Sequence, residues 1–541
     1  MIKSKKIAAV LLAAVAAAGV LGGCGGNVQE IDSTKTQLYI GNFDGGMGSR
    51  WLDVYIDGFE EMYKDTPFED GKTGVEVVPL NDKVMFEADT IQQSIANSTV
   101  NLFFTEGVSY YEFVDDGLLY DISDIVEANI PGEEESIAAK LSEQQRSYYA
   151  VDGKYYGLPH YRTFRGIVYD IDLFNEKRLY IKSDGTINGR STDTDLSAGP
   201  DGNPETTYDN GLPATYEEFF KWCDYVKTYK NVIPICWTGA YKESYTKHLL
   251  DALRTDAQGY VGAQLLHSVN ADAAVETTLI SGFDEGVPQT EKKTITRSNY
   301  KEVVKSEGVY YALKFLSTLI ENNYYYSLSM NGTQTHELTH YDFLHSRFDP
   351  DTTPIAMMIE GTWWEEESND IFASMAQTYD NASREERNFG FLPLPKADAA
   401  KAGPQVLFDG NASMVFVNGN CDAVHADLAK KFIQYISTDA NLQLFNTITG
   451  IARDYDFSLT AEQKASLTTF ASSIDDLISA NGGIVYGYAL SRDNYLWSAV
   501  NRIDLNRARI GANVQTEPIN AFRTGVSAEE YFNGIWTNTN V

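Results

Sequence analysis

Gln37-Leu38-Tyr39-Ile40-Gly41 is a short apolar run bounded by turn residues, which predicts a buried strand. After a glycine-rich turn, large apolar residues recur at helical spacing from Trp51 to Met62, and a second strand is predicted at Val75–Val78. A strand, a helix and a further strand in this order form a βαβ unit. The sequence therefore predicts an α/β fold that begins with parallel strands.

The same alternation continues with a predicted helix at 90–96 and a predicted strand at Asn101–Thr105. In open α/β sheets, ligands bind beyond the carboxyl ends of the strands. The two loops that follow the first and third strands, 42–46 and 106–110, are therefore expected to contact a ligand. This makes Asp44 and Glu106 candidate binding residues.

Later segments add two helices and a surface insertion. Thr215 followed by Glu218 predicts a capped helix, and 427–437 predicts another. Residues 181–212 are rich in Gly, Asp, Asn, Thr and Pro without periodicity, which predicts a surface insertion. Its aspartates lack the fixed spacing of a calcium loop, so whether it holds a structural calcium ion is left open.

The amino-acid composition limits the classes of molecule that this protein is expected to bind. The net charge is −33, which argues against nucleic acid as a partner, and 43% hydrophobic residues suit globular packing in two or more domains. Besides Cys24 the cysteines are Cys223, Cys236 and Cys421, an odd number. Buried, unpaired cysteines are favoured over a Cys223–Cys236 bridge, which stays open.

The N-terminus predicts export and lipidation. Three lysines precede an apolar run at 7–20, and Leu21-Gly22-Gly23-Cys24 then forms a lipobox. We expect a signal peptide at 1–23, lipid on Cys24 and a flexible leash at 24–36. The lipid bilayer is thus one expected partner, and the expected location is the outer face of the cell membrane.

Several short stretches, taken in order, resemble the extracellular solute-binding lipoproteins that deliver carbohydrates to ABC importers. They are the lipobox, Asn101–Thr105 leading to Phe113–Ile122, Asp152–Pro159, Ile167–Phe174, Pro213–Phe219, Ala356–Trp364 and Ala429–Ile433. The resemblance runs from the N-terminus to about Ala452.

The resemblance implies two α/β lobes joined by hinge strands that close over a sugar. Carried over, the chain would cross between lobes near 158–167, 354–361 and 407–414. The expected N-terminal lobe is 37–160 with about 361–408, and the expected C-terminal lobe is 161–356 with about 412–541. A carbohydrate and ABC transporter permease subunits are the implied partners of a monomeric, non-enzymatic protein without cofactor or metal.

A sugar site needs aromatic planes for stacking and polar side chains for hydroxyl groups. The family places a stacking residue where this chain has Trp363 and Trp364, and it often returns a loop toward the cleft at Arg453. Other candidates lie at predicted strand ends or crossings: Asp44, Glu106, His160, Arg165, Trp237, Tyr241, Asp409 and Asn411.

One motif supports a different function. His336-Glu337-Leu338-Thr339-His340 fits the H-E-x-x-H pattern, in which a helix presents two imidazoles to zinc and the glutamate acts as general base. The metzincin extension is absent, because Phe343 and Ser346 stand where Gly and His belong. A zinc endopeptidase and a peptide-binding receptor are therefore kept as alternatives to the sugar receptor.

Overall fold

A computed structural model describes residues 31–267, 274–490, 503–511 and 514–539. The predicted signal peptide, Cys24 and most of the predicted leash lie outside the described residues. No helix within these ranges is long and apolar enough to cross a membrane.

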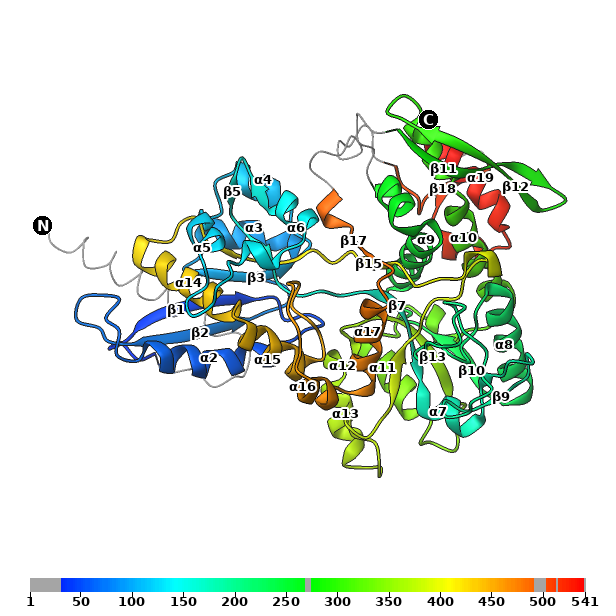
Figure 1. Cartoon of the computed structure of the whole chain (residues 1–541), viewed down its shortest axis with the longest axis horizontal. Coiled ribbons are helices and arrows are strands. Elements are labelled where there is room, and N and C mark those ends of the chain that lie inside the picture. The colour runs from blue at the N-terminus through cyan, green and yellow to red at the C-terminus, as the bar shows by residue number, and fades with distance from the viewer. Residues whose placement is uncertain (1–30, 268–273, 491–502, 512–513, 540–541) are drawn as a thin grey trace, which may run out of the picture.

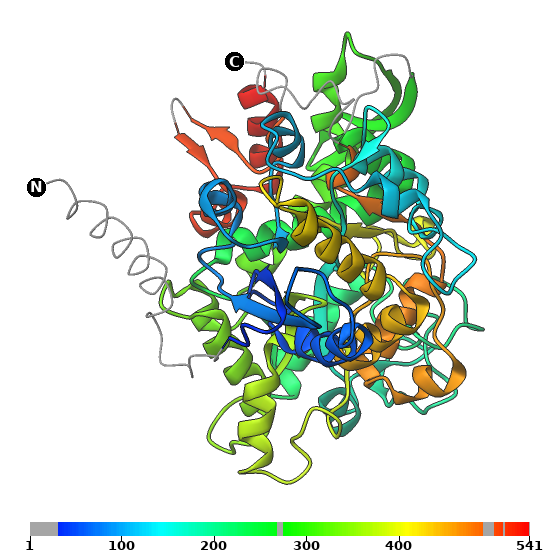
Figure 2. The same cartoon turned by 90° about the vertical axis from the view of Figure 1, so that its left-hand side faces the viewer.

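The chain forms two α/β lobes (Figure 1). The first lobe, which faces the viewer in Figure 2, contains a five-stranded sheet with the strand order β2-β1-β3-β16-β6. β1 pairs in parallel with β2 and β3, so each connection needs a crossover helix, as the βαβ pattern predicts. The strands are β1 (Thr36–Asn42), β2 (Val75–Asn81), β3 (Leu102–Glu106), β6 (Leu158–Pro159) and β16 (Ser413–Val417).

The helices of the first lobe bury their apolar stripes against this sheet. In α2, Trp51, Tyr55 and Phe59 are buried as the spacing predicts, whereas Met62 is 58% exposed. The other helices of this lobe are α3 (Ala88–Asn97), α4 (Tyr110–Asp115), α5 (Ser123–Glu127), α6 (Glu143–Tyr149), α14 (Ala423–Ile436), α15 (Asp439–Thr449) and α16 (Ala461–Ser466), and α2 itself spans Arg50–Tyr63.

The second lobe contains a four-stranded mixed sheet with the order β10-β13-β7-β14. β13 is parallel to β10 and antiparallel to β7, and all seven of its residues are buried. The strands are β7 (Arg165–Asp170), β10 (Ile233–Cys236), β13 (Ile355–Gly361) and β14 (Phe389–Phe391).

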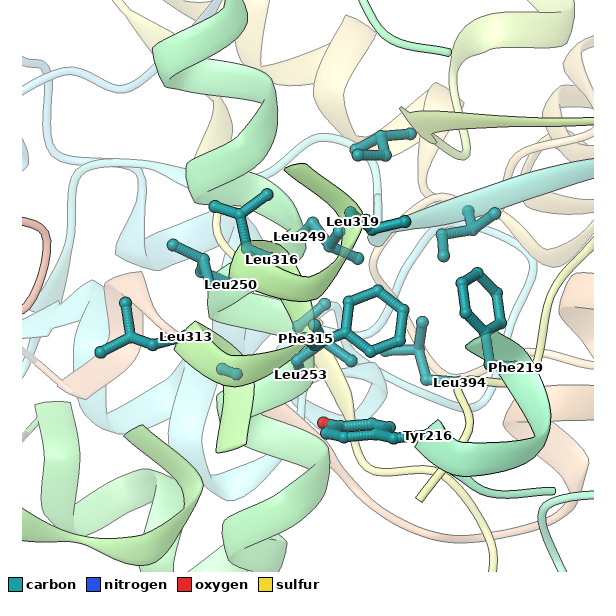
Figure 3. Close-up of a cluster of buried hydrophobic side chains, with 14 of the residues drawn as sticks. Tyr216, Phe219, Leu249, Leu250, Leu253, Leu313, Phe315, Leu316, Leu319 and Leu394 are labelled. Atoms are coloured by element: carbon teal, nitrogen blue, oxygen red, sulfur yellow. The ribbon is translucent and has the colours of Figure 1, made fainter. Parts of the chain in front are cut away.

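Helix packing provides most of the core of the second lobe. Figure 3 shows leucines of α9 and α10 meeting the aromatic rings of Tyr216 and Phe219 from α8. The Thr215 side chain accepts a hydrogen bond from the Glu218 amide, so the predicted cap of α8 is confirmed. The helices are α7 (Ile171–Lys177), α8 (Tyr216–Tyr229), α9 (Lys242–His267), α10 (Glu307–Glu321), α11 (His336–His345), α12 (Trp364–Glu367), α13 (Asn369–Ala376), α17 (Thr469–Ser479), α18 (Pro518–Arg523) and α19 (Ala528–Thr539).

Several two-stranded sheets lie outside the two main sheets. They are β4 (Ala150–Val151) with β5 (Lys154–Tyr155), β8 (Tyr180–Ile181) with β9 (Ile187–Gly189), β11 (Val275–Asp284) with β12 (Val287–Ile295), β15 (Leu407–Asp409) with β17 (Ile484–Tyr486), and β18 (Ala508–Ile510) with β19 (Val514–Thr516). β8 and β9 lie within or next to the predicted insertion, so that segment is partly ordered by a hairpin. In the described part of the chain, no three His, Cys, Asp or Glu side chains gather as a metal site would need.

The segments in which the chain crosses between the lobes lie only partly where the sequence predicted them. The chain crosses from β6 to β7 and from β15 to β16, as predicted near 158–167 and 407–414. The predicted crossing at 354–361 is wrong, because β13 pairs along its length inside the second sheet. The chain instead returns to the second lobe after α16, because the next helix, α17, packs against β14 of the second sheet.

The expected division of the chain into lobes also needs correction. Residues 361–408 belong with the second lobe, because β14 pairs with β7. The segment that begins at 412 enters the first lobe, because β16 pairs with β3 and β6. β14 and β16 are both short apolar strands, and their composition does not say which sheet will accept them.

The three cysteines within the described residues are unpaired. Cys223 and Cys236 are both buried and free, and Cys421 is free and partly buried. The favoured interpretation of buried thiols as small hydrophobic groups is confirmed for the first two.

A buried ion pair holds the second sheet together, and we predict a large cost for breaking it. Arg387 Nη2 lies 2.6 Å from Asp170 Oδ2, and both side chains are 1% exposed. Arg387→Met would leave the Asp170 charge unpaired in the interior and should lower the free energy of unfolding by about 3–5 kcal/mol. Urea denaturation measures the loss.

The control is the exposed pair between Lys292 and Glu276, whose side chains are 73% and 61% exposed. Lys292→Met should change the free energy of unfolding by less than about 1 kcal/mol. Equal losses in the two variants would contradict the assigned role of Arg387.

Candidate functional site

The two lobes meet where β1 and β13 end, around the indole ring of Trp363. A Cβ atom added to Gly46, which follows β1, would lie 2.7 Å from Cδ1 of this ring. A Cβ added to Gly361, the last residue of β13, would also collide with the ring. Both positions therefore need glycine, and the half-buried Trp363 touches both lobes.

Polar contacts join the lobes on two flanks. Arg50 at the start of α2 forms a bidentate ion pair with Glu366 of α12, with N···O distances of 3.0 and 2.6 Å. Glu366 also accepts a hydrogen bond from Arg384 at 2.9 Å. Elsewhere, Gln144 of α6 donates to the hydroxyl of Tyr260 in α9. These contacts fix the separation of the lobes in this conformation.

The first lobe presents Glu106 to the junction. This residue ends β3 and lies beside Phe43, Met47, His160 and Tyr161 around a gap too small to hold a water molecule. Burial raises the pKa of the Glu106 carboxyl to about 7, and the negative charge of Glu367 adds to that rise. Arg165 and Lys83 act in the opposite direction on the same pKa. Glu106 is thus a carboxyl group that titrates near neutral pH.

The second lobe contributes Trp363, His248 and Glu367. The rings of Trp363 and His248 are 6.3 Å apart and nearly perpendicular, at 87°. Oε2 of Glu367 is buried without a hydrogen-bond partner, and Oε1 lies 3.6 Å from Nε2 of His336.

The sequence analysis did not identify Glu367, His248 or Lys83 as candidate site residues. Glu367 lies four residues beyond Trp363, so reading one helical turn past the aromatic pair would have found it.

Several predicted site residues lie in the cores instead. Trp364 is 0% exposed, with its ring 5.0 Å from that of Phe389, and Trp237 is also 0% exposed. His160 is 2% exposed and lies 4.5 Å from the ring of Trp51. These positions correct the expectation that Trp364 and Trp237 offer a surface to a ligand.

Three more predicted residues have other surroundings. Arg453 is 0% exposed and donates from Nε to the carbonyl of His160 at 3.1 Å, so it braces the first crossing. Tyr241 is 56% exposed on the loop after β10, and Asp44 is exposed on the loop after β1. Their contact with a ligand stays a prediction.

Arg165, Asp409 and Asn411 hold the crossing segments against each other. Arg165 donates from Nη2 to Oδ1 of Asn411 at 2.8 Å, and the Asn411 amide donates to Asp409 at 3.3 Å. Ala412, in the same crossing, has a φ of 49°, a left-handed conformation that costs a non-glycine residue about 1 kcal/mol. These residues therefore belong to the hinge.

The H-E-x-x-H motif does form a helix, but its second histidine is already engaged. His340 is 1% exposed, with Nε2 3.1 Å from Glu360 and Nδ1 3.0 Å from Ser368. His336 lies 2.9 Å from Glu337, and the two histidine rings are 6.2 Å apart. This arrangement does not offer two free imidazole nitrogens to one zinc ion.

The raised pKa of Glu106 predicts a pH-dependent stability. Its ordinary value is 4.5 and its value in the folded protein is about 7, so the folded state binds more protons between these values. Glu106 therefore removes stability as the pH rises through this window. Glu106→Gln should raise the free energy of unfolding by about 1–3 kcal/mol near pH 8 and change it little near pH 4.

Urea denaturation at both pH values measures the effect, with the exposed Glu134→Gln as control. A gain from Glu106→Gln that is equal at the two pH values would show that this carboxyl is not the titrating group.

Solved structures of similar fold are sugar-binding proteins by name. The solute-binding protein RafE in complex with raffinose matches with a TM-score of 0.56 at 13% identity, covering 94% of this chain and 99% of RafE. A chitin oligosaccharide binding protein matches with a TM-score of 0.55 at 13% identity, with the same coverage. The cyclic alpha-maltosyl-1,6-maltose binding protein from Arthrobacter globiformis matches at 0.52 and 12% identity, over 94% of this chain and 98% of that one.

At these identities the likeness shows the shared two-lobed fold, which confirms the predicted fold class. No curated protein matches the sequence significantly. The sequence model of the bacterial extracellular solute-binding proteins matches residues 59–452, which is more than half of the chain. The protein belongs to the family of bacterial extracellular solute-binding proteins.

Proposed function

We propose that this protein captures a carbohydrate, specifically an oligosaccharide, and delivers it to the permease of an ABC transporter. The observation that carries the proposal is the half-buried indole of Trp363 at the junction of the lobes, which packs against Gly46 of the first lobe and Gly361 of the second. A sugar presents flat C–H faces to an aromatic ring and hydroxyl groups to carboxylate oxygens. The sugar ligands named for proteins of similar fold support the same class of ligand.

The function requires no covalent step. A ligand that contacts both lobes favours the conformation in which they are close, and the hinge segments absorb the rotation. The receptor therefore acts through a difference in affinity between its open and closed conformations. Neither a peptidase nor a peptide receptor has a specific observation in its favour, and peptide binding is an outcome of the test below.

We expect Trp363 to dominate sugar affinity. A thermal-shift panel of oligosaccharides and peptides should find a saccharide that raises Tm, because a ligand at about 100 times its Kd adds about 2.7 kcal/mol. Trp363→Ala should remove most of that rise, since it deletes the half-buried aromatic ring that would stack on the sugar. X-ray scattering should show a more compact protein with the same saccharide.

Trp364→Ala is the matched control. It removes a core ring and should lower the free energy of unfolding of the unliganded protein by about 3–5 kcal/mol, with sugar affinity kept. A Trp363→Ala protein that keeps its full sugar-induced shift, or a panel in which only peptides act, would contradict the proposal.

We further propose that lipid on Cys24 anchors the protein at the outer face of the cell membrane. The lipobox in the sequence supports this. Expressed in bacteria fed labelled palmitate, the protein should become labelled, and Cys24→Ala should abolish labelling because the acylated thiol is lost. Cys421→Ala should leave labelling intact. Equal labelling of the two variants would rule out this anchor.

A further inference from the structure

The aspartates of the insertion at 181–212 fall into two groups. Asp195 is 2.9 Å from Nζ of Lys182 and its side chain is 56% exposed, so its charge is both paired and solvated. Asp201 and Asp209 differ, because none of the lysines, arginines and histidines that the structure describes forms an ion pair with either of them. The protein therefore offers these two carboxylates no positive side chain.

The carboxylate of Asp209 is enclosed by the loop. This residue is 0% exposed. Its Oδ2 accepts a hydrogen bond from the backbone amide of Asp201 at 2.8 Å, whereas its Oδ1 is buried and has no hydrogen-bond partner. A Cβ atom added to Gly199 would lie 2.7 Å from Cγ of Asp209, so the chain at 199–201 packs directly on this carboxyl group. A carboxylate oxygen removed from water without a donor or a cation is costly.

Two further side-chain oxygens of the same loop share this property. Ser197 Oγ and Asn210 Oδ1 are both buried and have no hydrogen-bond partner. The backbone brings their segments together, because the amide of Gly211 donates to the carbonyl of Ser197 at 2.8 Å. The segments 197–201 and 209–211 therefore lie against each other, with three buried oxygens that meet no donor in the protein.

Asp201 adds a second carboxylate to this loop. Its Oδ1 accepts from the amide of Asn203 at 2.7 Å, and its Oδ2 accepts from the hydroxyl of Thr206 at 2.5 Å. These hydrogen bonds hold the carboxylate in place, and each oxygen keeps a further lone pair.

The ligand atoms of the loop favour one class of cation. Residues 197–211 contain no histidine or cysteine, the side chains that transition metals prefer. In the described ranges no three His, Cys, Asp or Glu side chains gather, so a metal in this loop must also use neutral oxygens. Calcium does so, because it takes six to eight oxygen ligands, among them carboxylates, amide and backbone carbonyls, and water. Magnesium is smaller and needs a near-ideal octahedron.

We propose that the loop at 197–211 binds a structural calcium ion through the carboxylates of Asp209 and Asp201, with Ser197 Oγ and Asn210 Oδ1 as further ligands. The loop does not follow the spacing of an EF-hand, and contacts across the loop bring its oxygens together instead. A calcium ion compensates both carboxylates and gives the buried oxygens the partner that the protein does not provide.

The ion fastens the insertion to the second lobe. The amide of Gly403 donates to the carbonyl of Pro200 at 3.2 Å, and a Cβ added to Gly202 would lie 3.0 Å from Cβ of Ala402. The segment at 402–403 leads into β15, from which the chain crosses between the lobes. Calcium sites of extracellular modules have a Kd of about 10⁻⁴–10⁻³ M, which suits a member of an extracellular family.

Thermal unfolding and isothermal titration calorimetry test this site. The protein is treated with EDTA, transferred to metal-free buffer and titrated with calcium chloride or magnesium chloride. We expect a calcium Kd of about 10⁻⁴ M. Calcium at about 10 mM should raise Tm by at least about 3 °C, and magnesium at the same concentration should raise it by less than a third of that amount.

The variants identify the ligands. Asp209→Asn and Asp201→Asn should each weaken calcium binding at least about tenfold and remove most of the rise in Tm. Without calcium, Asp209→Asn should not lower Tm, because it neutralises a buried, unpaired charge, whereas a carboxylate with a merely structural role would be missed. Asp195→Asn makes the same charge change in the same insertion and should keep the calcium response.

Three results would overturn the inference: equal effects of calcium and magnesium on Tm, calcium affinity kept in both Asp209→Asn and Asp201→Asn, or an equal loss of affinity in Asp195→Asn. No saccharide takes part in these measurements. The calcium site and the proposed sugar receptor therefore succeed or fail separately.

Discussion

The packing of the Trp363 indole between Gly46 and Gly361 sets how closely the two lobes approach each other. Each glycine ends or follows a strand, so the ring fixes the position of β1 in one sheet relative to β13 in the other. Any larger residue at either position would need the space that the ring occupies. The ring is only half buried, so it can act as a spacer and still offer a surface to a ligand.

The charged groups around this contact fall into two kinds. At the hinge and on the flank, ionic side chains are paired: Arg162 lies 2.8 Å from Asp454, and Arg50 and Arg384 both contact Glu366. Pairing offsets the cost of removing these charges from water. By contrast, Glu367 at the junction and Asp409 at the hinge each keep a buried oxygen without a hydrogen-bond partner. The paired charges support the fold, whereas each unpartnered oxygen is still able to accept a hydrogen bond.

The sequence predicted local structure well where periodicity is strong. β1, β2, β3, α8 and α14 lie where alternation, helical spacing and the Thr215 cap placed them. It did not predict which sheet receives β13 or β16, because both are short, wholly buried strands and their pairing is decided by distant partners. Strand-end reasoning likewise found Glu106, but it could not separate Trp363 from Trp364. Adjacent residues in a helical turn point in directions about 100° apart, so one ring reaches the junction and its neighbour enters the core.

The H-E-x-x-H motif shows why a spacing must be judged together with the atoms it meets. The i, i+4 interval does place His336 and His340 on one face of α11. Glu360, however, is 1% exposed on β13, and a buried carboxylate needs a donor. His340 supplies it from Nε2, and its other ring nitrogen hydrogen-bonds with Ser368.

The protonation of His340 also argues against zinc. Although burial lowers the pKa of His340, the hydrogen bond with Glu360 raises it, and the net shift is upward. An imidazole held by a carboxylate in this way favours its protonated form, whereas a zinc ligand must be neutral with a free nitrogen. The second histidine of the motif thus satisfies a buried carboxylate of β13 in the second sheet and is not free to bind a catalytic metal.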